Sequence, residues 1–367
     1  MSDVKIEIDF LPVGDGEKSG DAIAIRYGDE NELFVHVVDG GTQESGEALV
    51  GHINQYYDNP TWVDNLVCTH GDDDHSSGLR TVIENFNVGK IWMNRPWLYA
   101  SELTQSFKGN WSAEGLRKNL RESFPILAEI EDMANDRGII IEEAFQGKHI
   151  GPFIIASPSR QFYLSLIPHF SRTPEPVEEA KQGFSFLKFL GEAGKSMAYA
   201  ASKLVPDSWD IEYLPGGETA ASNESSVVQY AHFGDKRIML TGDAGLEALN
   251  RATDFLHAHG YKTQNMNLIQ IPHHGSRRNV STQVLNKLIG ASIIRDGSVG
   301  SAYVSASKGE SDHPRKRVLN AFTRRGYQVH STEGTTKGYN HNIPMKPGWS
   351  SAEPHPFYDH VEEEGVA

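Results

Sequence analysis

The sequence predicts a layered α/β fold, because short strand-like runs alternate with helical segments. Several of these runs are rich in Val and Ile and are bounded by Gly, Asp or Asn, which is typical of strands. Strands that alternate with helices form sheets covered by helices. The first four runs are Val4–Val13, Asp21–Tyr27, Leu33–Asp39 and Asn65–Thr69, and Glu47–Tyr57 indicates a helix between the third and the fourth.

The same alternation continues towards the C-terminus. A helix is expected from His75 to about Phe86, followed by a short strand at Lys90–Met93. The residues from Ser350 to Ala367 are acidic and contain proline, and we expect an arm of low structural weight there. In the last part of the chain we predict strands at Ser225–His232, Lys236–Thr241, Leu268–Ile271, Ala302–Ser305 and Gln328–Ser331, and helices at Leu246–His259, Thr282–Leu288 and Lys316–Arg324.

The region from about 100 to 220 has a different character. Glu114–Asp136 is strongly helical and stops at Gly138, a residue type that commonly ends helices. Strands are expected at 139–143 and 152–156, and residues 172–204 contain many helix formers. We interpret the region as a helical insertion or cap within one domain spanning 1–349. A peripheral pair of packing helices is an equally good interpretation.

Composition limits the classes of function. The chain has 367 residues with 38% hydrophobic and 23% charged residues, as in ordinary globular proteins. A net charge of −15 argues against a protein that coats long duplex DNA, but not against one that binds a small phosphodiester or a nucleic-acid end. No run approaches the roughly 20 apolar residues of a membrane span, and the N-terminus does not resemble a secretory signal, so we expect a cytoplasmic protein. The single cysteine, Cys68, excludes an intrachain disulfide and argues against a thiolate metal cage.

The most informative segment, Thr69–His75, places two histidines and three aspartates directly after a predicted strand. Neighbouring carboxylates repel one another unless a cation neutralises them. A loop at a strand end can point alternate side chains into one cleft, so His70, Asp72 and Asp74 can converge. His75 would then supply a further ligand from the start of the next helix. The alternative, an acidic turn that caps this helix, requires only one aspartate.

Three other segments agree with a metal centre. Asp243 follows a buried strand and a glycine, although it could also be the N-cap of the next helix. His273 and His274 follow an apolar run. Adjacent residues of a strand point opposite ways, so one histidine should face a metal and the other the substrate or a ligand's partner; a pair of core histidines is the alternative. Asp39, in an Asp-Gly-Gly turn, is expected to accept the N–H of a ligand imidazole, or else only to form the turn. Isolated histidines such as His36 fit no ligand spacing.

The segment His70-x-Asp72-x-Asp74-His75 resembles the His-x-His-x-Asp-His signature of the metallo-β-lactamase superfamily, with Asp72 in place of the middle histidine. Together with the other motifs it is similar to the hydrolase domain of ComEC-type competence proteins and their stand-alone relatives. The resemblance covers most of the chain outside roughly 100–220, and it implies a four-layer αββα sandwich with a helical insertion. The other matching segments are Gly14–Ile25, Val38–Gly41, Asn223–Val228, Leu240–Asp243, Ile271–Ser276 and His313–Pro314.

The resemblance implies two divalent metal ions, Zn²⁺ or Mn²⁺. His70 and Asp72 would bind one ion, Asp74 and His75 would bind the other, and Asp243 would bridge the two. An aspartate in place of a histidine makes the site harder and more anionic, so Mn²⁺ competes with Zn²⁺.

Further roles follow from the same resemblance. His274, or alternatively His273, would complete a coordination sphere. Asn223 stands where many members have another histidine ligand, so one ion would keep more water. His313 would be either a late ligand or a group near the leaving atom. The sequence leaves these alternatives open.

The implied activity is hydrolysis by a hydroxide shared between two metals, with Asp74, Asp243, His274 and His313 as the catalytic residues. We favour a phosphodiesterase or nuclease. The alternatives are hydrolysis of a lactone, thioester or β-lactam, and a non-catalytic metal-binding effector or partner protein. The sequence predicts neither the substrate nor the oligomeric state. Residues expected to contact ligands or substrate are Asp39, Asn223, Ser276 and Lys308, and the basic residues near the motifs, each of which could instead be solvated, are Arg277, Arg278, Lys308, Arg315, Lys316 and Arg317.

Overall fold

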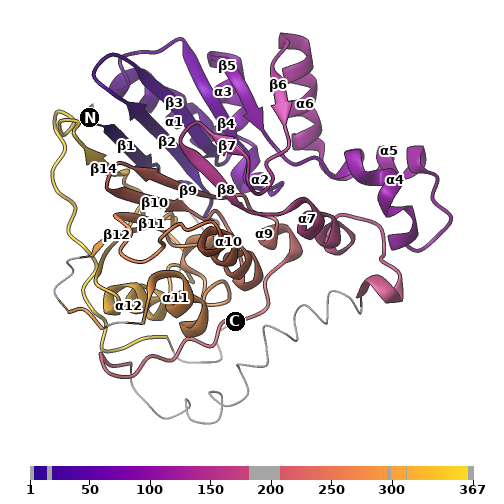
Figure 1. Ribbon diagram of the computed structural model, residues 1–367. Helices are drawn as coiled ribbons and strands as arrows, with labels where there is room; N and C mark the ends of the chain where they lie inside the picture. Colours follow the sequence, from indigo (N-terminus) through magenta and orange to yellow (C-terminus); the bar gives the residue numbers. More distant parts are fainter. Residues whose placement is uncertain are drawn as a thin grey trace.

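The fold is a sandwich of two seven-stranded sheets with helices on both outer faces (Figure 1). It is seen in a computed structural model that describes residues 4–14, 19–181, 207–291, 293–295, 299–310 and 312–362. The predicted four-layer αββα sandwich is therefore confirmed. Within the described ranges, no helix is long and apolar enough to cross a membrane.

The first sheet has the strand order β14-β1-β2-β3-β4-β5-β6. Neighbouring strands are antiparallel from β14 to β3 and parallel from β3 to β6. Its strands are β1 (Lys5–Phe10), β2 (Ala22–Gly28), β3 (Leu33–Gly40), β4 (Trp62–Val67), β5 (Asn87–Trp92), β6 (Ile140–Glu142) and β14 (Lys337–His341), and its outer face carries α1 (Gln43–Tyr56), α3 (Leu79–Asn85) and α6 (Pro125–Arg137).

The second sheet repeats this plan with the order β13-β12-β11-β10-β9-β8-β7. Here β10 to β13 are parallel and β7 to β10 are antiparallel. Its strands are β7 (His149–Ile150), β8 (Phe153–Ser157), β9 (Val228–Phe233), β10 (Lys236–Leu240), β11 (Leu268–Gln270), β12 (Gly300–Val304) and β13 (Tyr327–Ser331), and its outer face carries α10 (Leu246–Ala258), α11 (Thr282–Ile289) and α12 (Lys316–Arg324).

The core between the sheets follows from alternation along each strand. In β1, Ile6, Ile8 and Phe10 are fully buried in the cluster that both sheets share. The ring of Phe10 stacks on Tyr303 of the second sheet, with centroids 5.0 Å apart. Each such fully buried apolar side chain contributes about 1.5–3 kcal/mol to stability. This core fixes the two sheets against each other and so fixes the strand ends that carry the site.

Two predicted helices are interrupted. The helix expected from His75 to Phe86 is divided into α2 (Asp73–Ser76) and α3. At the interruption, Gly78 lies so close to Gly40 that an added Cβ would be 2.0 Å from the Gly40 carbonyl oxygen. The helix expected at 114–136 is divided into α5 (Ala113–Ser123) and α6, which begins at Pro125, because proline cannot continue a helix. Gly138 ends α6 with a φ of 67°, as predicted.

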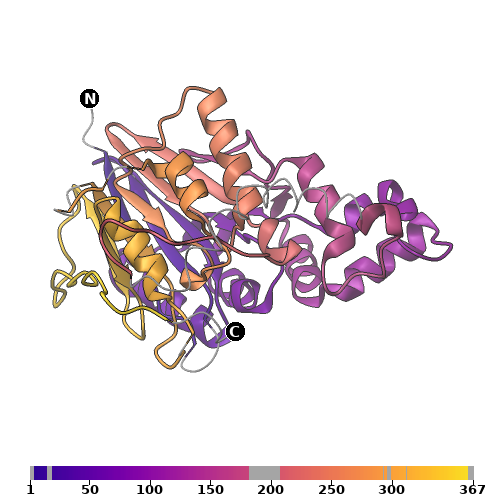
Figure 2. The same cartoon turned by 90° about the horizontal axis from the view of Figure 1, so that it is seen from below.

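The region 100–220 is not one block of insertion. Strands β6, β7 and β8 within it are edge strands of the two main sheets. The helical stretch 172–204 lies outside the described residues from 182 onwards. The helices on either side of these strands form a lobe beside the sandwich, purple to magenta in Figure 2. They are η1 (Pro96–Tyr99), α4 (Ala100–Leu103), η2 (Thr104–Ser106) and α5 before them, and α7 (Arg160–Leu166) and η3 (Ile167–His169) after them.

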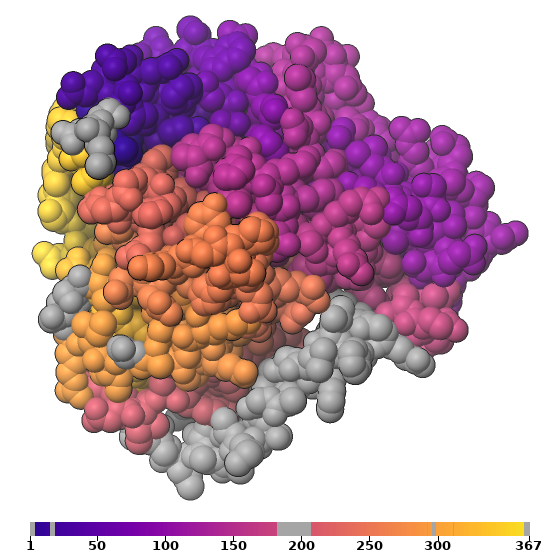
Figure 3. Space-filling model, viewed as in Figure 1, coloured from indigo at the N-terminus to yellow at the C-terminus, as the bar shows by residue number. Residues whose placement is uncertain are grey.

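The acidic tail carries more structure than the sequence indicated. Residues 350–362 lie against α12 and β13, where the backbone N–H of Tyr358 donates to Asn320 Oδ1 at 2.8 Å and that of His355 donates to the Val329 carbonyl at 2.8 Å. Strand β14, which its polar composition concealed, pairs with β1. Figure 3 accordingly shows C-terminal residues (yellow) beside the first strands (indigo).

Candidate metal centre

The predicted site residues gather where parallel strands of both sheets end. Asp39 lies at the end of β3, and His70 follows β4. From the second sheet, Asp243 follows β10, and His273 and His274 follow β11. Because parallel strands bring their carboxyl ends to one edge, segments up to 235 residues apart in sequence converge there.

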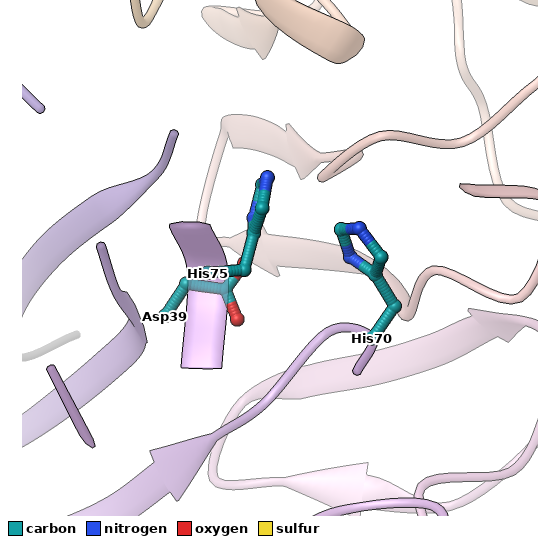
Figure 4. A group of neighbouring side chains, drawn as sticks. All are labelled: Asp39, His70 and His75. Carbon is teal, nitrogen blue, oxygen red and sulfur yellow. The ribbon is translucent and has the colours of Figure 1, made fainter. Parts of the chain in front are cut away.

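Asp39 fixes the orientation of His75. Its Oδ2 accepts a hydrogen bond from His75 Nδ1 at 2.8 Å, and its Oδ1 accepts one from the Thr69 backbone N–H at 2.7 Å. Since Nδ1 carries the proton of the neutral ring, the Nε2 lone pair is free, and it lies 3.4 Å from Asp243 Oδ2. Figure 4 shows Asp39 beside His75, with the ring of His70 next to it.

The ring of His70 is held 4.3 Å from that of His75, measured between centroids. Its Nδ1 contacts the Thr69 hydroxyl at 3.0 Å. Its Nε2 lies 3.5 Å from Asp72 Oδ2 and 3.9 Å from Asp243 Oδ2. The loop after β4 therefore directs a second imidazole nitrogen at the same carboxylates.

The third imidazole comes from the second sheet. His274 Nδ1 donates to the Ser305 carbonyl at 3.0 Å, which leaves its Nε2 lone pair free at 3.8 Å from Asp243 Oδ1. His274 is buried. Both sheets thus contribute imidazole nitrogens that approach Asp243.

The converging atoms lack hydrogen-bond partners. Among the described residues, the buried unpartnered atoms include Nε2 of His70, His75 and His274 and Oδ1 of Asp243. Leaving a buried polar atom unpaired costs about 1–3 kcal/mol, whereas a divalent cation uses such lone pairs as ligands. The residues therefore fit a divalent metal site. Four sets have one ligand atom of each residue within 4.8 Å of the others, namely Asp39–His70–His75, Asp74–His75–His274, Asp243–His273–His274 and Asp21–His75–Asp243.

The charges in this centre also favour a cation. Burial on its own lowers the pKa of His75, but the neighbouring carboxylates of Asp243 and Asp39 raise that pKa well above its usual value. For Asp72, burial acts to raise the pKa, while the contact with His70 lowers it to about 2. The carboxylates therefore attract positive charge to the imidazoles, and a metal ion can supply that charge.

The prediction for the adjacent histidines is wrong in its geometry. Strand β11 ends at Gln270, and His273 and His274 lie in a 3₁₀ turn, each with a positive φ, of 47° and 55°. Because the two histidines do not lie on a strand, their side chains do not point in opposite directions. Both rings approach Asp243. His273 Nδ1 lies 2.5 Å from Asp243 Oδ2 and 2.9 Å from the Asn223 amide. His273 is partly exposed, so it borders both the metal centre and the solvent.

A cleft of about 410 Å³ adjoins the centre on this side. His313 lies in it without belonging to any of the four sets of potential ligands within the described ranges. Its Nδ1 is 2.5 Å from Glu310 Oε1. The other predicted residues that line the cleft are Asn223, His273, Ser276, Arg277, Arg278 and Arg315.

Several predicted contacts do not belong to this cleft. The side chain of Lys308 lies against Gly334, Lys316 lies over the Tyr358 ring at 5.2 Å, and Arg317 lies over Tyr213 at 5.7 Å. Only three of the six basic residues that we expected near phosphate therefore line it. Sequence proximity to a motif does not determine which way a long side chain points.

Asp73 and Cys68 also lie outside the converging set. Asp73 Oδ1 is 2.9 Å from the guanidinium of Arg172, so it turns away from the neighbouring aspartates. Cys68 is buried, and burial raises the pKa of its thiol well above the usual value, as suits a packing residue.

Sequence reasoning missed Asp21, Gln270 and Glu310. The Gln270 Oε1 accepts hydrogen bonds from the backbone N–H groups of Thr241 and Gly242 at 2.9 and 3.0 Å, and its Nε2 donates to Asp21 Oδ2 at 2.8 Å. Asp21 lies in the Gly14–Ile25 segment on which the resemblance partly rests, which was a usable signal. For Gln270 and Glu310 the sequence contained no such signal.

Comparisons with known proteins give only distant similarity. No family model and no curated protein matches the chain. The metallo-β-lactamase fold protein YhfI from Bacillus subtilis has a TM-score of 0.41 at 9% identity, covering 92% of this chain and 100% of its own. Yeast PDE1 has a TM-score of 0.39 at 11% identity, with 92% and 99% covered, and a diphosphatase from the PhnP family has 0.38 at 10%, with 91% and 98% covered. The αββα assignment rests on the strand order itself.

Proposed function

We propose that the protein is a metal-dependent phosphodiesterase whose substrate is a small phosphodiester or a nucleic-acid end. The main support for this proposal is that three buried, unpartnered imidazole nitrogens converge on Asp243, next to a cleft that is lined by three arginines. The net charge of −15 disfavours extensive contacts between the protein surface and a long nucleic acid, and it favours a substrate that contacts the protein mainly in this cleft.

The family resemblance divides the ligands between two ions that share Asp243. His70 and Asp72 would hold one ion, Asp74 and His75 the other, and Asp243 would contact both. His274 would complete the set, since its Nε2 is free and buried. A bound pair of divalent ions supplies Lewis acidity and lowers the pKa of water towards 7.

The cleft residues would position the phosphodiester. Arg277, Arg278 and Arg315 line the cleft, and guanidinium groups can bind phosphate oxygens in pairs. The Glu310 carboxylate orients the ring of His313 through Nδ1, so Nε2 is the atom that would exchange a proton with the leaving oxygen. We therefore propose for His313 the second of its two predicted roles, that of a group near the leaving atom.

The test is hydrolysis of bis-p-nitrophenyl phosphate and of single- and double-stranded DNA with Mn²⁺ or Zn²⁺. Asp243→Asn should lower kcat/KM by about 10³-fold or more, because it removes the carboxylate that both ions share. Asp73→Asn is the matched control from the same loop, since Asp73 pairs with Arg172 instead of facing the centre. Activity that survives in Asp243→Asn, or that is lost equally in Asp73→Asn, would contradict the proposal.

Two other outcomes would redirect it. Hydrolysis of nitrocefin or an acyl-lactone, with no turnover of phosphodiesters, would assign the same centre to carbon-centred substrates. Fewer than one metal ion per chain after equilibrium dialysis would indicate a non-catalytic binding protein.

A further inference from the structure

Asp21 is a buried carboxylate that no sequence motif placed in the metal centre. It lies directly before β2 and is 1% exposed. Its Oδ2 accepts the hydrogen bond from Gln270, whereas its Oδ1 has no partner. The orientation of Gln270 is determined, because its oxygen accepts from two backbone N–H groups, so its nitrogen must be the donor to Asp21.

The surroundings of Asp21 direct it to the metal centre. Its Oδ2 lies 3.8 Å from His75 Nδ1, and Asp21, His75 and Asp243 form one of the sets with ligand atoms within 4.8 Å. Gly20 permits this approach, since an added Cβ there would be 2.1 Å from the Asp74 carbonyl oxygen. No lysine or arginine in the described part of the chain forms an ion pair with Asp21.

Burial raises the pKa of Asp21, so this carboxyl group needs a counter-charge whenever it is ionised. The nearest candidates are the imidazoles of the centre, whose own free nitrogens already face Asp243. The hydrogen bond from Gln270 accounts for one oxygen of Asp21 only. The other oxygen is where a positive ion would compensate the charge at the lowest cost.

We infer that Asp21 is a further metal ligand, whose Oδ1 binds the divalent cation that His75 and Asp243 approach. The inference rests on the proposed function in requiring that the centre holds cations, and it adds a carboxylate from the first sheet that the superfamily signature does not contain. Carboxylate oxygens are ligands that suit Mn²⁺, whereas softer ligands, such as thiolates, favour Zn²⁺. Asp21 therefore shifts the preference of the centre towards Mn²⁺.

The experiment titrates the full-length, EDTA-treated protein with MnCl₂ or ZnCl₂ by calorimetry and records thermal unfolding with and without metal. Asp21→Asn keeps an oxygen that can accept from Gln270 but removes the charge. We expect the Mn²⁺ Kd to rise at least about tenfold and the Zn²⁺ Kd to rise less. The metal-free variant should be at least as stable as the natural protein, because an uncompensated buried charge has been removed.

The matched control is Asp9→Asn, which neutralises another fully buried carboxylate, on the adjacent strand β1. Asp9 pairs with Lys346 and His52 instead of the metal centre. Its variant should unfold at a lower temperature both with and without metal, and should keep the natural Kd for both ions.

The outcomes separate the two proposals. Two bound ions in the natural protein, with unchanged Mn²⁺ and Zn²⁺ Kd in Asp21→Asn, would overturn the role of Asp21 and leave the proposed function standing. No bound ion in the natural protein would overturn both. Should Asp21→Asn not fold, anomalous scattering from crystals of the natural protein soaked in MnCl₂ decides the question. An ion within about 2.6 Å of Asp21 Oδ1 supports the inference, and Mn²⁺ bound only farther away overturns it.

Discussion

The protein contains two buried clusters of charged side chains that differ in how their polar atoms are satisfied. In the cluster on the outer face of β1, all four carboxylate oxygens of Glu7 and Asp9 accept from Arg26, Lys346 or neighbouring donors. In the metal centre, imidazole and carboxylate atoms of similar burial have no hydrogen-bond partner. The first cluster balances its own charge, and the second leaves its charge to be balanced by a ligand.

This difference in hydrogen bonding tells more about where a ligand binds than the presence of acidic residues does. Burial acts to raise the pKa of Asp9, yet the hydrogen bond from His52 and the charge of Lys346 leave that pKa below its usual value. Asp9 is therefore a stabilising carboxylate that needs nothing further. Buried polar groups are normally satisfied, so a convergent set of unsatisfied ones indicates a missing ligand.

The largest expected effect is stabilisation of the metal centre by its ions. With each of two sites at a hundredfold excess over its Kd, the free energy of unfolding should rise by about 5 kcal/mol. The measurement is denaturant unfolding in EDTA and in MnCl₂. An identical midpoint in both conditions would mean that the unpartnered atoms do not bind these ions, and the contrast between the clusters would fail.

The next effect concerns the outer cluster. Lys346→Met should lower the free energy of unfolding by about 3–5 kcal/mol, because it leaves Glu7 and Asp9 as buried charges without their lysine. The metal-induced increase in stability should remain that of the natural protein. A variant that loses metal binding together with stability would show that the two clusters are coupled.

Periodicity and strand-end motifs are local signals, and from them the sequence predicted the alternating strands and helices and five candidate site residues, four in the loop after β4 and one at the end of β10. The four-layer αββα arrangement was implied by the family resemblance. The sequence did not predict Gln270, whose role depends on Asp21, 249 residues away along the chain, or Glu310, which acts through His313. Neither residue belongs to a local pattern of ligands.

Backbone conformation caused the other errors. His273 and His274 were placed on a strand, but the strand ends at Gln270 and both residues adopt a positive φ. The helix after His75 was drawn as continuous, whereas Gly78 packs against Gly40. At Gly78 the tertiary contact determines the local structure.

His36 tests whether an unpaired imidazole alone makes a metal site. It lies between the sheets, with its ring 5.1 Å from that of Phe153, and burial lowers its pKa to about 3, more than Gln229 raises it. Between pH 6.5 and 3 the unfolded chain binds a proton at this residue and the folded chain does not. Stability should therefore fall by about 1.4 kcal/mol per pH unit as the pH decreases through this range.

His36→Phe should remove that part of the pH dependence, as measured by urea unfolding at pH 7, 6 and 5. The exposed His232 of β9 provides the control, because His232→Asn should leave the slope unchanged. An equal slope in the natural protein and in His36→Phe would show that other groups cause it. The metal Kd should be the same in both, since no carboxylate of the described residues acts on His36 as Asp243 acts on His75.

The smallest effect is expected at Arg172, which follows the helical lobe and forms an ion pair with Asp73 in the loop after β4. Its ion pair with Asp73 is 37% and 57% exposed on the two sides, so Arg172→Met should change stability by less than about 1 kcal/mol. The side chain also interacts with the charges of Asp72 and Asp74. Removing this positive charge makes the centre more attractive to cations, so the Mn²⁺ Kd should fall by up to about fivefold at low salt, and by less at 1 M salt, where exposed charges are screened. A higher Kd in Arg172→Met would instead mean that the lobe holds the loop in its binding conformation, and the metal centre would then depend on a contact outside the sandwich.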